Sequence, residues 1–397
     1  DITDNVLTAT RAFQGTAAAW DAGTPVARYF TAYDADTFAD NIEDLAARPS
    51  QSMERQAIID GNFQIAQLAA GAAYAAPPNA SYPVFDLWKV YYAVDGGTPP
   101  TITHSQGAIT PGDLDKSSFC YKISVDGAGS SYGNSSHYSL LHYVENGVRN
   151  LCGAGKKVTL SFWARSTISG KKLGVSLYQY YGTGGSPSSA EILNGTTVIL
   201  TSAWQKFTYT FTTNTLSGKT FGTAGNDYLR PTFWLQWGSN YQTYIGASGA
   251  ESWVGSGDIE ITQVQLCAGD EALPFEPKTY AEELRACQRY FQILGGDGSY
   301  GHPVGPSAIS TSSLVLIPVN FPVAMRIRPA VSINGTRGTD WFLATSVAAV
   351  NTTGTFGYQG GTPRGVTLKF SSGTFTDGTP YYINCNSVAT IRFDARF

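Results

Sequence analysis

Seven residues suited to molecular recognition occupy alternate positions in three predicted strands. They are Trp163 and Arg165, then Tyr178 and Tyr180, then Arg230, Trp234 and Gln236. Because side chains alternate between the two faces of a strand, all seven lie opposite the apolar positions that form the predicted core. Aromatic rings stack on the apolar faces of pyranose sugars, and guanidinium and amide groups hydrogen-bond to paired hydroxyls. The pattern predicts a glycan-binding face.

The sequence leaves two alternatives open for recognition. The same face could instead pack against another strand layer, a neighbouring domain or another subunit. A second aromatic set, Tyr241, Tyr244 and Trp253, lies in the Gly- and Ser-rich stretch 238–257. Loop tips commonly carry recognition residues, so this stretch is also a candidate.

No arrangement of residues in the sequence points to catalysis. Glycosidases use two carboxylates, but Asp95, Asp126 and Asp377 each precede a glycine, where turn formation explains them. The chain lacks a G-x-S-x-G elbow, and its histidines lack zinc-protease spacing. His137 and His142 are expected on opposite faces of one strand. We therefore predict that the protein is not an enzyme.

Composition excludes several other classes. Charged residues make up only 14% of the 397, whereas 43 glycines and 13% aromatics favour an extracellular or virion β protein. A net charge of −4 without a basic run argues against nucleic-acid binding. No stretch approaches the roughly 20 apolar residues of a membrane span. Five scattered cysteines, with no C-x-x-C pair, indicate buried thiols rather than a disulfide framework.

The chain divides into four predicted parts. Residues 1–57, with a predicted helix from Asp36 to Ala47, form a small α/β segment suited to attachment or oligomerisation. Residues 58–272 contain short strands separated by turn residues, as in a β-sandwich. The predicted core positions are Val158, Leu160, Phe162 and Ala164; Leu173, Val175 and Leu177; Phe207, Tyr209 and Phe211; and Leu229, Phe233 and Leu235.

A linking helix and a second β block follow the sandwich. Within residues 273–294, Thr279 and Glu282 have the spacing of a capping box, and the predicted helix covers residues 279–294. Its apolar stripe is Tyr280, Leu284, Cys287, Phe291 and Leu294. Residues 295–397 form a C-terminal β-sandwich tip domain with predicted strands at 313–319, 329–334, 365–370, 380–385 and 388–395. Pro318, Pro322 and Pro329 place the strands there at an edge or interrupt them.

The helical segment also carries a family resemblance. The run PFEPKTYAEELRACQRYFQ at residues 274–292 resembles a segment of bacteriophage tail fibre and receptor-binding proteins. Segments 59–65, 157–164, 201–207 and 261–266 are similar, in order, to the carbohydrate-binding-module-like jelly roll of those proteins. Segments 321–331 and 391–397 resemble their tip domain, so the resemblance spans residues 58–397.

The resemblance implies a homotrimeric fibre of the phage tail. Its N-terminal segment would attach to other tail proteins of the virion, and its jelly roll would adsorb the phage to bacterial surface polysaccharide or lipopolysaccharide. Jelly rolls of this kind often hold one calcium ion, for which Asp60, Asn62, Asp258 and Glu260 are candidate ligands or, equally, solvated strand ends. We otherwise expect no cofactor. The alternatives are a tail enzyme that degrades capsule or lipopolysaccharide, and a purely structural tail or baseplate component.

Overall fold

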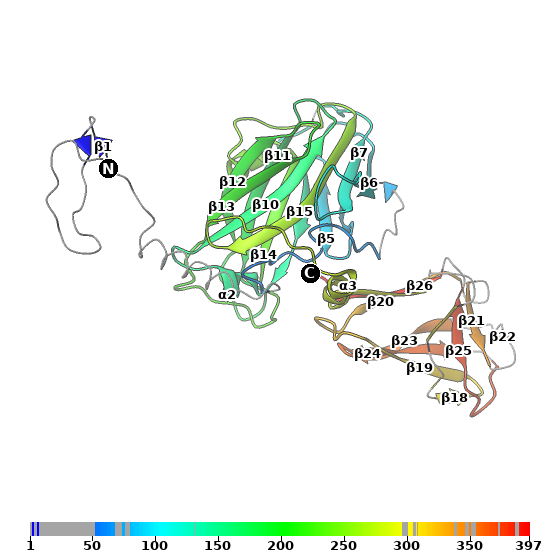
Figure 1. The fold of residues 1–397 in the computed structure, drawn as a ribbon. Coiled ribbons are helices and arrows are strands. Elements are labelled where there is room, and N and C mark those ends of the chain that lie inside the picture. Colours follow the sequence, from blue (N-terminus) through cyan, green and yellow to red (C-terminus); the bar gives the residue numbers. More distant parts are fainter. Residues whose placement is uncertain are drawn as a thin grey trace.

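The computed structural model describes two β units and a small N-terminal hairpin. The described residues are 2–3, 6–7, 52–67, 74–75, 80–130, 132–295, 301–304, 307, 309–336, 340–345, 349–350, 355–371, 374–385 and 389–397. The helix predicted from Asp36 to Ala47 lies outside them, as does most of segment 1–57. The hairpin pairs β1 (Ile2–Thr3) with β2 (Val6–Leu7). Figure 1 shows the two β units meeting near α3 (Tyr280–Gln288), where the C-terminus also lies.

The larger unit is a sandwich of two antiparallel sheets. The β10 sheet runs in the order β13 (Gln205–Thr212), β10 (Lys157–Ser166), β15 (Gly257–Ala268), β7 (Phe119–Val125), β6 (Ile102–Ala108) and β3 (Tyr74–Ala75). The β14 sheet runs in the order β12 (Glu191–Ile199), β11 (Lys172–Tyr180), β14 (Tyr228–Trp237), β8 (His137–His142), β5 (Trp88–Ala93) and β4 (Ala80–Pro83), and β9 (Val144–Glu145) also pairs with β14. The chain passes from one sheet to the other after β3, β5, β7, β9, β10, β12, β13 and β14. This path makes the unit a jelly roll, and the predicted mainly β fold class is confirmed.

The predicted core lies between these two sheets. Of the predicted core positions, eleven belong to one buried hydrophobic cluster, and Phe207 and Tyr209 pack against it half-buried. Residues 54–57, at the end of the predicted N-terminal segment, hydrogen-bond to β15: the Ala57 amide donates to the Leu266 carbonyl at 3.0 Å. The core positions could be predicted because side chains alternate along a strand and only one face of each strand meets the other sheet.

Two histidines are buried in the same core. Tyr138 Oη lies 3.0 Å from His104 Nε2, and the His142 ring packs against Trp88 at 4.7 Å between centroids. Burial lowers the pKa of each histidine to about 3, so both are neutral at ordinary pH. His137 lies on the opposite face of β8, as the five-residue spacing predicts.

The linking helix is shorter than predicted. Thr279 and Glu282 form the predicted capping box, but α3 ends at Gln288, and the chain continues as strand β16 (Phe291–Gly295). Tyr280 is 59% exposed, so it does not belong to a buried stripe. Cys287 instead packs with Ile65 and Leu87 of the same chain, which supply the surface that the helix needs. Leu284 lies at the edge of that cluster.

The second unit contains all five predicted strands and several that the sequence did not reveal. Its sheets are β16, β26 (Thr390–Asp394) and β20 (Ala330–Asn334); β17 (Gly301–Val304), β25 (Tyr382–Cys385), β21 (Trp341–Ala344) and β22 (Ala349–Val350); and β18 (Ile309–Thr311), β19 (Leu314–Asn320), β24 (Gly365–Ser371) and β23 (Thr355–Thr362). Pro318 pairs with Thr367 of β24, while β18 stops opposite Leu316. Among the described residues, no strand pairs with Pro318 on its other side, which suits a residue without an N–H. A separate hydrophobic cluster fills this unit.

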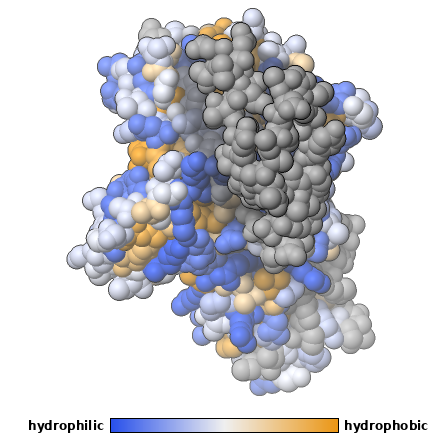
Figure 2. Space-filling model, turned by 60° about the vertical axis from the view of Figure 1, so that its left-hand side comes forward, coloured by the Kyte–Doolittle hydropathy of each residue, from blue (hydrophilic) through white to orange (hydrophobic). Residues whose placement is uncertain are grey.

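The surface of the protein is mixed in polarity. Figure 2 shows hydrophobic residues in separate patches among hydrophilic ones. The large apolar side chains that are exposed in the described part of the chain are Tyr91, Ile199, Val254, Tyr280 and Ile327. Among the described residues, no helix combines the length and the apolar character that a membrane crossing requires.

Substituting His142 with glutamine is expected to make stability less sensitive to acid. Below pH 6.5 the unfolded chain binds a proton that the folded chain excludes until its His142 pKa, about 3, is reached. Between pH 7.5 and pH 5 this histidine should cost the wild type about 2 kcal/mol of unfolding free energy. Urea titrations of both proteins at the two pH values measure the difference. Equal losses in wild type and His142→Gln would contradict this assignment.

Candidate functional site

The seven predicted recognition residues lie on two different sheets. Trp163 and Arg165 are on β10, whereas the other five are on β11 and β14. The outer faces of the two sheets point away from each other across the core, so the prediction of a single face is wrong. Alternation along a strand shows which side chains point outward, but not to which sheet the strand belongs.

On the outer face of the β10 sheet, the predicted recognition residue Arg165 is bound by other side chains of the same chain. The Arg165 guanidinium forms ion pairs with Glu260 and, at 3.7 Å, with Asp113. It also lies 4.7 Å from the centroid of the Trp204 ring. Trp163 is half-buried beside this cluster on β10. Arg165 is therefore occupied by partners within the chain.

Gln236 does not belong to an exposed face. The pairing of β14 with β8 shifts between Trp234 and Gln236, so that Gln236 lies opposite the core residue Tyr138. Its side chain is fully buried, and neither amide atom has a hydrogen-bond partner among the described residues. A β-bulge of this kind reverses the inward and outward positions that simple alternation predicts. Trp234 remains on the outer side but is only 7% exposed.

A groove of about 430 Å³ crosses the outer face of the β14 sheet. Strand pairing sets three rows of side chains across the sheet. The middle row contains Leu141, Thr232 and Ser176, which pair directly across β8, β14 and β11. These short side chains form the floor, and the Thr232 hydroxyl has no hydrogen-bond partner among the described residues.

The first wall of the groove is an aromatic cluster around Trp234. The rings of His137, Tyr241 and Tyr244 lie 5.6, 5.2 and 6.3 Å from the Trp234 ring, between centroids. Tyr91, which is 45% exposed, extends the wall with its ring 4.8 Å from that of His137. These side chains come from β5, β8, β14 and the 3-10 helix η1 (Ser239–Ile245).

A glycine allows η1 to close over the sheet. A Cβ atom at Gly174 would lie 2.8 Å from Ile245 Cδ1, closer than a real side chain permits. Ile245 is fully buried with Trp234 and Trp237, and η1 thereby holds Tyr241 and Tyr244 beside the groove. The Trp234 indole N–H donates to Ser176 Oγ at 2.8 Å, which orients the ring across the floor.

The second wall combines an arginine with tyrosines. The Arg230 guanidinium lies 4.2 Å from the centroid of its cross-strand neighbour Tyr178 and 6.0 Å from that of Tyr143. Tyr180 stacks on Tyr228 at 4.6 Å, just beyond this wall. Arg230 forms no ion pair with any described residue, and its Nε is buried without a partner. Arg230 is also the only charged residue among those that the structure shows lining the groove.

The groove is suited to recognition through rings and hydrogen bonds. Burial lowers the pKa of His137, which stays neutral at ordinary pH and lies 3.3 Å from the Ser135 carbonyl through Nδ1. The described lining offers aromatic rings, hydroxyls, one imidazole and one guanidinium. Rings bind apolar faces, and the other groups can donate to or accept from a ligand's hydroxyls.

Sequence reasoning missed part of the groove and misplaced one loop residue. Tyr91, His137 and Tyr143 line the groove but were not among the predicted site residues. For Tyr91, the sequence did contain a signal: Lys89 and Tyr91 occupy alternate positions of β5 and therefore share one face of the strand. Tyr241 and Tyr244 do reach the site, whereas Trp253 is fully buried in the core beside Tyr138.

The residues considered for calcium lie in two environments. Asp258 forms an ion pair with Lys122 at 2.8 Å, and Glu260 pairs with Arg165. Asp60 is fully buried and accepts from the amides of residues 64 and 65, and burial, followed by Glu283 and Asp86, raises the pKa of Asp60. Among the described residues, no three His, Cys, Asp or Glu side chains are grouped to hold a metal ion.

Comparison with known proteins found no matching family model and no matching curated protein. Solved structures similar to part of the chain include the N-terminal cellulose-binding domain of a Cellulomonas fimi β-1,4-glucanase, with 16% identity, covering 49% of this chain and 99% of that one at a TM-score of 0.28. A xylan-binding domain from Paenibacillus barcinonensis has 15% identity, with 42% and 86% covered and a TM-score of 0.26. A family 11 carbohydrate-binding module from Clostridium thermocellum has 11% identity, with 50% and 96% covered and a TM-score of 0.26. At these scores the fold assignment rests on the strand order itself.

Trp234 and Tyr91 are expected to differ sharply in their contribution to stability. Trp234→Ala removes a buried ring with four aromatic or hydroxyl neighbours and should lower the free energy of unfolding by about 3 to 5 kcal/mol. Tyr91→Ala, at an exposed position, should change it by less than about 1 kcal/mol. Urea unfolding followed by circular dichroism compares the two. A small effect of Trp234→Ala would show that the aromatic wall is not packed as described.

Proposed function

We propose that this protein binds a polysaccharide noncovalently in the groove of the β14 sheet. One observation carries the proposal: a floor of short side chains, with the unpartnered Thr232 hydroxyl, lies between an aromatic wall and an Arg–Tyr wall. A groove open along its length accepts a chain, and rings at its sides stack on sugars without requiring charge. The row crosses three strands, about 10 Å, and fits a short stretch of a sugar chain.

We further propose that this binding adsorbs a phage to a bacterial surface glycan. Support comes from the resemblance of residues 58–397 to tail fibre and receptor-binding proteins. In that role the protein is a homotrimer of the virion tail, attached to other tail proteins through its N-terminal segment. Three weak sites on one particle would reach useful strength through avidity, because the second and third binding events become intramolecular.

Two other functions remain as outcomes of the test. A tail enzyme would shorten the polysaccharide, which requires carboxylates outside the groove lining described above. A purely structural component would bury the groove against another subunit. Tyr91 tests the structural function, because its exposed ring would lie in the subunit interface of a structural component.

Binding is expected to depend on the groove and not on the opposite sheet. Tyr91→Ala and Tyr178→Ala should each weaken binding to surface polysaccharides by about tenfold or more, because each removes one ring that contacts the sugar. Trp163→Ala is the matched control, since it removes an aromatic side chain from the outer face of the β10 sheet. An array of bacterial surface polysaccharides measures affinity, with molar mass and thermal unfolding checked for each variant.

The outcomes of this experiment separate the functions. Loss of binding in Tyr91→Ala and Tyr178→Ala, with full binding in Trp163→Ala, supports the groove. Loss only in Trp163→Ala moves the site to the other sheet. Shortened oligosaccharides after incubation with the wild type establish an enzyme. A change in molar mass for Tyr91→Ala, without glycan binding by the wild type, favours the structural component.

A further inference from the structure

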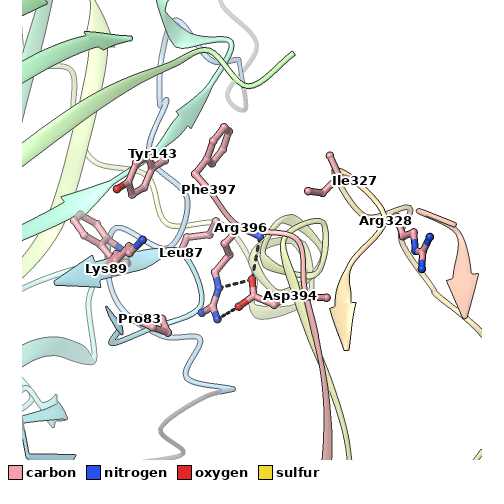
Figure 3. Close-up of a pocket in the computed structure, with 11 residues that line it drawn as sticks. Pro83, Leu87, Lys89, Tyr143, Ile327, Arg328, Asp394, Arg396 and Phe397 are labelled. Carbon is pink, nitrogen blue, oxygen red and sulfur yellow. Dashed lines mark hydrogen bonds and ion pairs between the residues drawn. The ribbon is translucent and has the colours of Figure 1, made fainter. Parts of the chain in front are cut away.

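A second cavity lies at the end of the groove, between the sandwich and the second β unit. Its volume is about 460 Å³. Its lining includes Lys89 and Tyr143 from the sandwich, and Arg328, Asp394, Arg396 and Phe397 from the second unit. Figure 3 shows Arg396 and Phe397 reaching toward the side chains of the sandwich. We refer to this cavity as the junction pocket.

The groove and the junction pocket adjoin each other. The floor row of the groove, Ser176, Thr232 and Leu141, continues across the sheet to Lys89, which pairs directly with Leu141. Lys89 lines the junction pocket, and Tyr143 lines both cavities. A chain lying along the floor of the groove and continuing past β8 would therefore reach Lys89, with Pro83 of the edge strand β4 beyond it.

Two cations that have no ion pair within the described part of the chain flank this point, and Arg230 is near enough to act on the pKa of Lys89. Neither Lys89 nor Arg230 forms an ion pair or side-chain hydrogen bond with any described residue, although the Asp394 carboxylate is near enough to act on the pKa of Lys89. The one carboxylate of the pocket, Asp394, is held by Arg396 through two bonds of 2.9 and 2.5 Å. Arg328 is directed away, toward the Tyr358 hydroxyl at 2.7 Å.

The local positive charge is not a consequence of composition. The chain as a whole has a net charge of −4, yet after Arg396 pairs with Asp394 and Arg328 turns toward Tyr358, the described pocket lining still carries the Lys89 ammonium. Burial, and then the nearby Arg396, lower the pKa of Lys89; Asp394 acts in the opposite direction, and Arg230 adds to the lowering. The ammonium is thus partly desolvated beside other cations, an arrangement that an anion would stabilise.

We propose that the polysaccharide bound in the groove is acidic, and that a carboxylate or phosphate of one of its units binds between Lys89 and Arg230 beside Tyr143. This inference rests on the proposed glycan binding and adds the chemical class of the ligand. Charge-assisted hydrogen bonds from a lysine and an arginine are stronger than those between neutral groups. Tyr143 supplies a ring against which the same sugar unit packs.

The test compares acidic bacterial polysaccharides before and after their charge is removed. Each uronate-containing polysaccharide is used native and carboxyl-reduced, and each phosphate-containing one native and dephosphorylated, beside neutral polysaccharides. The proteins are wild type, Lys89→Gln, Lys89→Arg and Lys206→Gln. Lys206 is an exposed lysine of β13, on the other sheet, and its variant controls for a general loss of positive charge.

Removal of the acidic group is expected to weaken wild-type binding by about tenfold. Lys89→Gln should lose the same factor on native polysaccharide and nothing on the neutralised one, whereas Lys89→Arg and Lys206→Gln should behave as wild type. The treatment that weakens binding by this factor, carboxyl reduction or dephosphorylation, distinguishes carboxylate from phosphate. Equal affinity for native and neutralised polysaccharides overturns the inference and leaves the proposed function standing. Binding to none of the polysaccharides overturns both.

Discussion

The pairing of β14 with β8 on one side and β11 on the other is the constraint on which the site depends. Backbone hydrogen bonds on both edges set Thr232 between Leu141 and Ser176, and Trp234 between Ser139 and Gly174. The intervening side chains of β14 point inward to the core. One strand thus builds the core and the groove together, and a register slip of one residue would exchange the two faces.

Two local departures from regular structure shape the groove. The bulge between Trp234 and Gln236 brings Trp237 to the outer side, where it joins Trp234 and Ile245. The absence of a side chain at Gly174 lets η1 settle on the sheet. Burying the Gln236 amide without hydrogen-bond partners destabilises the fold. The packing of the aromatic wall, which the same bulge makes possible, offsets that cost.

The second β unit is held against the sandwich by polar and aromatic contacts. Arg289 donates twice to Glu145 at 2.8 Å, and the Tyr290 hydroxyl donates to the same carboxylate at 2.8 Å. Burial acts to raise the pKa of Glu145, but these hydrogen bonds outweigh it and the pKa is lowered. Phe397 stacks on Tyr143 at 5.6 Å, and this contact closes one side of the junction pocket. Arg289 and Tyr290, directly after α3, thus help to hold the second unit beside a cavity to whose described lining they contribute no side chain.

The sequence by itself determined the features that depend on neighbouring residues. Alternation identified the buried side chains of β10, β11 and β14, and the Thr279–Glu282 spacing located the start of α3, because strand and helix geometry repeat over a few residues. Only the tertiary structure decided that Trp163 and Trp234 lie on opposite outer faces, that Gln236 turns inward, and that Tyr91 and His137 join the groove. Strand order and bulges arise from pairing between residues far apart in the chain, about which a local pattern carries no information.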